Sequence, residues 1–155
     1  MRSLVPIALL LAGAAGCSTT YIPNTDVEDN SQNRKVIQFC EEYRHAMEEK
    51  NVGKLLAMAS PQYHSRGVGT HDFVDFDRLK DTLTAEIPKT NAIRYEIKYQ
   101  KVIFTESNHV FVNYRYAASW KAARTDGSEE WQHRVMDNQL DLVPDGEGYK
   151  IVAGM

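Results

Sequence analysis

The side chains best suited to acid–base chemistry in this sequence are scattered rather than grouped. His64 falls in a short segment, 62–66, that we expect to be a strand near the mouth of a pocket, and Asp137 falls in an alternating segment, 131–143. A general acid or base must reach the reacting atom from within a pocket. Alternation turns Asp137 to the face opposite its neighbour Asn138. His64 and Asp137 are therefore only weak acid/base candidates, and the catalytic residues stay unassigned.

No spacing in the sequence is typical of a metal site or a nucleophilic centre. The histidines form no i, i+4 pair and there is no cysteine pair; they stand at positions 45, 64, 71, 109 and 133. Asp72, Asp75 and Asp77 lack EF-hand spacing, so helix capping suits them better. Cys40 lies on an apolar helical stripe, where a lone cysteine is usually a small hydrophobe. We expect no metal and no cofactor.

Aromatic and polar side chains on three strand-like segments form the best candidate for a binding pocket. If the face that carries Leu140 is concave, alternation brings these side chains to one cavity. The candidates are Tyr43, Tyr95, Tyr99, Tyr114, Tyr116, Arg134, Met136 and Asn138. Such a lining suits a small, partly apolar ligand with a polar or anionic group. The alternative is that the tyrosines are packed core whose hydroxyls reach its rim.

The elements that position these residues change type along the chain. Apolar residues at spacings of three and four predict helices over 31–50, over 52–59, and from Asp75 or Asp77 to about residue 87. Pro61 and Pro88 end the second and third helices. Residues 67–75 are expected to be a loop.

Strand-like alternation follows the last of these helices. It covers 93–104, 109–122, 131–143 and 149–153, with short turns between them. The order predicts an α+β fold with N-terminal helices packed on a curved antiparallel sheet of four to five strands.

The first residues have the pattern of a targeting signal rather than of a folded segment. Arg2 precedes an apolar run over 4–15, and small residues then lead to Cys17. This resembles a bacterial lipobox, which implies that 1–16 are a signal peptide and that Cys17 is lipidated and anchors the protein to the membrane. Ser18 resembles the sorting context of an outer-membrane lipoprotein. An ordinary secretory signal is the alternative.

Residues 17–33 then read as the lipidated cysteine and a flexible tether. The stretch is polar and carries Asp26, Glu28 and Asp29 without a basic residue among them. Alternatively, Tyr21 and Ile22 pack back on the domain.

Size and charge limit the remaining classes of protein. The chain has 155 residues, of which 43% are apolar, and this suits one globular domain. It has 18 basic and 21 acidic side chains, a net charge of -3, so we expect no nucleic-acid partner.

Two stretches carry a resemblance to a known superfamily over residues 34–155. They are VIQFCEEYRHAMEEKNVGKLLAMASPQYHS and WQHRVMDNQLDLVPDGEGYKIVAG. They resemble the nuclear transport factor 2-like proteins, including the ketosteroid isomerase-like and polyketide cyclase-like members. The resemblance implies a cone-shaped, cystatin-like α+β barrel with a pocket between helices and sheet.

Three functions stay open at this point. The leading one is a lipoprotein of the bacterial cell envelope, at the outer membrane and facing the periplasm. Its domain would bind a small apolar ligand or an envelope protein without catalysis. The alternatives are an isomerase-like or cyclase-like enzyme with a pocket Asp or His, and a homodimer that assembles through Phe111, Trp131 and Val135.

Overall fold

The first helix begins where the sequence offers a side-chain cap. The structure is a computed structural model, and it describes residues 19–66 and 72–155. Helix α1 (Ser31–Glu48) starts after Asn30, whose side chain accepts a hydrogen bond from the backbone N–H of Asn33 at 2.8 Å. Helix α1 thus begins at Ser31, as the spacing of its apolar residues predicts, and the cap is Asn30 rather than Ser31.

Among the described residues, five elements lie between α1 and the first strand of the main sheet. They are α2 (Val52–Met58), β1 (His64–Arg66), β2 (Phe73–Asp75), α3 (Phe76–Glu86) and the 3-10 helix η1 (Ile87–Lys89). The Asp75 carboxylate accepts from the N–H of Arg78 at 2.9 Å and so caps α3. The loop expected over 67–75 is wrong for 73–75, because β2 pairs with β1.

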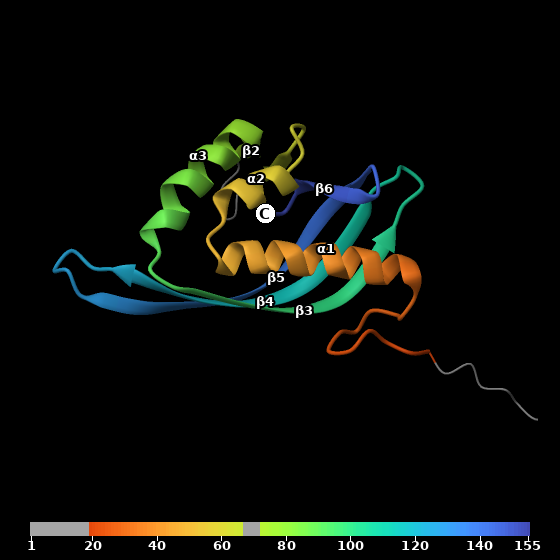
Figure 1. Ribbon diagram of the computed structural model, residues 1–155, viewed down its shortest axis with the longest axis horizontal. Coiled ribbons are helices and arrows are strands. Elements are labelled where there is room, and N and C mark those ends of the chain that lie inside the picture. The colour runs from red at the N-terminus through yellow and green to blue at the C-terminus, as the bar shows by residue number, and fades with distance from the viewer. Residues whose placement is uncertain (1–18, 67–71) are drawn as a thin grey trace, which may run out of the picture.

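Four antiparallel strands then form the main sheet in the order of the chain. They are β3 (Ile93–Phe104), β4 (Val110–Ala123), β5 (Glu129–Asp145) and β6 (Gly148–Ala153). All three helices lie on one face of this curved sheet, and the β4–β5 hairpin runs out beyond them (Figure 1). The α+β class and the packing of helices on a curved sheet are confirmed.

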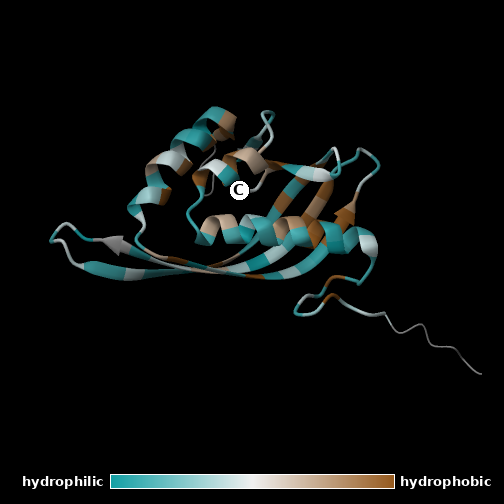
Figure 2. Ribbon diagram, viewed as in Figure 1, coloured by the Kyte–Doolittle hydropathy of each residue, from teal (hydrophilic) through white to brown (hydrophobic). Residues whose placement is uncertain are grey.

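The core lies between α1 and the sheet. Its fully buried side chains include Val36 and Cys40 of α1, and Val112, Tyr114 and Leu140 of the sheet. The strands are apolar where α1 covers them and mostly hydrophilic along the projecting hairpin (Figure 2). The helix-facing side of the sheet is therefore the one that carries Leu140, as alternation requires.

On the opposite, convex face of the sheet, polar side chains of neighbouring strands interact in pairs. Arg115 and Asp137 form an ion pair at 2.8 Å, and Gln139 donates to Asn113 at 2.7 Å. Along the convex face of β4, these pairs lie between Phe111 and Ala117, and Ala117 pairs across the strands with Val135. The three apolar side chains expected to support a homodimer thus do not form one continuous patch.

The segment before α1 packs on the domain, which corrects the expectation of a plain tether. Tyr21 and Glu28 form an isolated antiparallel β-bridge. The backbone N–H of Asp26 donates a hydrogen bond to the Tyr99 carbonyl at 2.9 Å. Val27 is 2% exposed and belongs to the core. Ile22 also packs against the core, so Val27, Ile22 and the backbone hydrogen bond to the edge strand β3 together hold this polar segment on the domain.

The expected signal peptide and Cys17 lie outside the described residues. Among the residues that are described, no helix has the length and apolar character needed to cross a membrane.

Replacement of Val27 tests whether the N-terminal segment contributes to the fold. Val27→Ala removes two buried methyl groups and should lower the free energy of unfolding by about 2 kcal/mol. Urea denaturation measures the change, with the exposed neighbour Thr20→Ala as the control. Equal stability of the two variants would show that residues 19–30 are only a tether.

Candidate functional site

A pocket of about 400 Å³ opens on the concave face of the sheet, beside the C-terminal end of α1. Its aromatic walls are Tyr43, Tyr95, Tyr116 and Trp120. The other side chains of the lining are Met47, Glu86, Ile87, Thr90, Ile93, Ala118, Arg134, Asn138 and Met155. We call this space the concave pocket. Its volume is within the range of small-molecule sites.

Five of the eight residues proposed from the sequence lie in this lining. They are Tyr43, Tyr95, Tyr116, Arg134 and Asn138. Tyr114 is fully buried beneath them, and its hydroxyl accepts a hydrogen bond from Asn138 Nδ2 at 2.9 Å. Met136 lies on the same face of β5 but is outside the described lining and 36% exposed.

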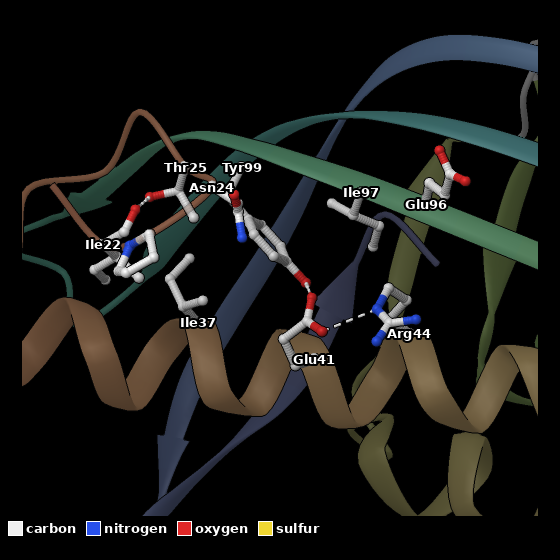
Figure 3. A pocket seen from close by; sticks show the side chains of 10 residues that line it. Ile22, Asn24, Thr25, Ile37, Glu41, Arg44, Glu96, Ile97 and Tyr99 are labelled. Carbon is white, nitrogen blue, oxygen red and sulfur yellow. Dashed lines mark hydrogen bonds and ion pairs between the residues drawn. The ribbon is translucent and has the colours of Figure 1, made fainter.

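Tyr99 lies in a different pocket, of about 460 Å³, between α1 and β3 (Figure 3). Its hydroxyl donates to Glu41 Oε1 at 2.8 Å, and Arg44 Nε donates to Glu41 Oε2 at 2.9 Å. Arg44 also donates to Glu48, which in turn accepts from the N–H of Tyr95 at 3.1 Å. These groups satisfy one another and fasten α1 to the edge strand, so we assign Tyr99 a structural role.

Neither weak acid/base candidate reaches the concave pocket. His64 is exposed on β1 and stacks on Phe73, with ring centres 4.5 Å apart. Asp137 lies on the convex face, where the hydrogen bond from Arg115 lowers the pKa of its carboxyl. Both carboxylate oxygens of Asp137 accept from Arg115, so this side chain belongs to a surface ion pair.

The pocket also contains residues that the sequence did not single out. Trp120 shares the concave face of β4 with Tyr116, so alternation alone could have found it. Glu86 and Thr90 come from the end of α3 and the residue after η1, and only tertiary packing brings them to the strands. Glu86 is 64% exposed and pairs with Lys89 Nζ at 2.8 Å.

The tyrosine hydroxyls in and beneath the pocket lining are held in the neutral form. Burial raises the pKa of Tyr43, Tyr95 and Tyr114 above the ordinary value. Such hydroxyls stay protonated at neutral pH. They can donate and accept hydrogen bonds, but they do not supply a base.

The end of the chain completes the pocket floor. Asn138 Nδ2 also donates to the carbonyl of Gly154 at 3.0 Å, and Met155 lines the pocket. Gly154 has φ +94, and a Cβ there would clash with the Gln139 carbonyl, so only glycine allows this approach.

The described residues hold no group of three or more His, Cys, Asp and Glu side chains placed to bind a metal ion. Cys40 is fully buried, and burial raises the pKa of its thiol, which makes it a poor nucleophile.

Comparison with solved structures identifies the architecture. A candidate dehydratase of the NTF2-like family from Streptomyces avermitilis superposes with a TM-score of 0.69 at 10% identity, covering 81% of this chain and 95% of that one. The chain has the nuclear transport factor 2-like fold. A ketosteroid isomerase-like protein from Erwinia carotovora atroseptica gives a TM-score of 0.61 at 17% identity, with 81% and 95% coverage.

Structures with this fold are named for different activities. A candidate calcium/calmodulin-dependent protein kinase II association domain from Xanthomonas campestris gives a TM-score of 0.64 at 11% identity, covering 88% of this chain and 90% of that one. No protein-family model matches the sequence, and no curated protein matches it. At these identities the likeness establishes the fold alone, and the function must be argued from the site.

The buried tyrosines predict a loss of stability at alkaline pH. Their folded-state pKa values are raised above the unfolded value of about 10, so stability is full below about pH 10 and falls as the pH rises toward the folded pKa. Tyr114→Phe should make the fall in unfolding free energy shallower by ~1.4 kcal/mol per pH unit.

Urea denaturation from pH 9 upward would measure this slope. Phe104→Leu, an exposed change without an ionisable group, is the control and should leave the slope unaltered. The same slope in Tyr114→Phe as in the unmodified protein would refute the assignment.

Proposed function

We propose that this protein is a lipid-anchored component of the bacterial cell envelope whose domain binds a small ligand in the concave pocket without catalysis. The observation that carries the proposal is the composition of the pocket lining. The lining has aromatic walls, a few polar groups and an arginine. Among the described residues, its titratable side chains are the tyrosines, Arg134 and Glu86, and only Glu86 is a carboxylate. Glu86 is largely exposed and ion-paired with Lys89.

This lining fits binding better than isomerase or dehydratase chemistry. General acid–base catalysis needs a group with a pKa near the working pH, held within reach of the substrate. The described lining has no histidine. The tyrosine hydroxyls behind it are kept neutral by burial, so they favour recognition of polar ligand atoms over proton abstraction.

The sequence supports the membrane anchor. Arg2, the apolar run 4–15, the small residues before Cys17 and the cysteine itself stand in lipobox order. Acyl chains at Cys17 would give stable membrane attachment, since each buried methylene adds about 0.8 kcal/mol. The net charge of -3 does not favour electrostatic binding to an anionic bilayer. The mature protein would then face the periplasm from the outer membrane.

A pair of neighbouring alanines tests the binding function. Ala118→Leu places a larger side chain in the concave pocket, whereas Ala117→Leu places the same side chain on the convex face. Isothermal titration of the full chain in phosphatidylcholine vesicles with 1-naphthamide, a neutral aromatic probe, should detect binding to the unmodified protein. Ala118→Leu should weaken it about tenfold or more through overlap with the probe.

Ala117→Leu is the matched control and should bind the probe like the unmodified protein, with the melting temperature of each variant showing that it is folded. Absence of binding to the unmodified protein, or equal binding by Ala118→Leu, would contradict the proposal.

Cys17→Ala tests the anchor separately. The change removes the thiol that accepts the lipid, so the precursor should stay uncleaved by signal peptidase II and unlabelled by a fatty-acid probe. Undiminished fatty-acid labelling of Cys17→Ala would refute the lipoprotein assignment.

A further inference from the structure

The lining of the concave pocket includes one arginine, although the protein as a whole is acidic. Arg134 lies in the lining, and Lys50 Nζ donates to the carbonyl of Thr90, also in the lining, at 2.8 Å. Lys89 precedes Thr90 and pairs with Glu86. Three cationic side chains, Arg134, Lys50 and Lys89, thus lie in or beside the pocket, together with two carboxylates, Glu86 and Glu48, the second of which accepts from the N–H of Tyr95 at 3.1 Å.

Arg134 is the cation best placed to meet a ligand. Among the described residues no carboxylate lies within ion-pair distance of it, whereas Lys89 is already paired with Glu86. Its guanidinium lies over the ring of Trp120 at 5.8 Å, which orients the charged plane beside the pocket wall. On β5 it pairs across the strands with Ala118, at the pocket surface. A planar guanidinium held in this way can donate two parallel hydrogen bonds to a carboxylate.

The walls indicate the rest of the ligand. Tyr95 packs against Tyr116 with ring centres 5.2 Å apart, and Tyr43 meets Tyr95 edge to face at 6.4 Å. Aromatic side chains favour offset or edge contacts with another ring. The lining therefore suits a flat, ring-containing body more than a charged or strongly hydrated one.

We propose that the concave pocket takes a small anion with a ring-containing apolar body, and that Arg134 binds its oxyanion group. This inference rests on the proposed binding function, and it makes Arg134 the residue that determines specificity. The body of the ligand contacts the tyrosine and tryptophan rings, and the anionic group points to Arg134.

Two probes that differ in charge test the inference. The full chain in phosphatidylcholine vesicles is titrated calorimetrically with 1-naphthoate and with 1-naphthamide, and the heat from empty vesicles is subtracted. The unmodified protein should bind 1-naphthoate about tenfold more tightly, because only the carboxylate makes charge-assisted hydrogen bonds to Arg134. Added salt should weaken the binding of 1-naphthoate more than that of 1-naphthamide.

Arg134→Gln should remove this preference while leaving the affinity for 1-naphthamide within about twofold, and Arg134→Lys should restore part of it. Arg94→Gln is the matched control, because Arg94 also lies over a tryptophan, Trp131 at 5.6 Å, but on the convex face. It should keep the full preference for 1-naphthoate. The melting temperature of each variant reports whether it is folded.

Equal affinities of the unmodified protein for the two probes would overturn the inference and leave the binding function standing. So would an unchanged preference in Arg134→Gln, or an equal loss in Arg94→Gln. Failure of the unmodified protein to bind either probe would overturn the proposed function, and this inference with it.

Discussion

The packing of α1 across a layer of tyrosines is the contact on which the rest of the structure depends. Tyr43 of the helix meets Tyr95 of the edge strand, and Tyr114 lies fully buried beneath them. The Tyr114 hydroxyl is withdrawn from water but accepts a hydrogen bond from Asn138, so this buried group avoids the cost of an unpaired polar atom. Beside this layer, Glu41 and Glu48 connect the helix to Tyr99 and to the backbone of Tyr95.

The pocket follows from where that packing stops. Helix α1 ends at Glu48, while β4 and β5 continue along the projecting hairpin (Figure 1). Past the end of the helix the sheet still presents its concave side chains, among them Tyr116, Trp120 and Arg134, and α3 with η1 covers them only in part. The same side chains would be ordinary core if the helix were longer. The cavity therefore needs no dedicated loop, only a mismatch in length between helix and sheet.

The sequence predicts the structure best in segments where apolar side chains recur with a single clear period. Alternation located β3 at 93–104 and separated Tyr116 and Arg134 from Arg115 and Asp137, because the two faces of a strand meet different surroundings. Alternation does not show which of those side chains α1 covers, so it predicts Tyr99 and Met136 in the pocket although neither lies in its lining. Glu86 could not be anticipated, since the end of α3 reaches the strands only through tertiary packing. The polar composition of the segment around Val27 predicts a tether, because composition does not show a backbone hydrogen bond to an edge strand such as the one from Asp26 to Tyr99.

The central claim is that ligands enter the concave pocket, and amide chemical-shift mapping by NMR during titration with 1-naphthoate tests it most directly. The account predicts that the largest shifts fall on residues 87–90, 116–120 and 134, around one cavity. Shifts confined to the convex face, or to the pocket beside Tyr99, would contradict it.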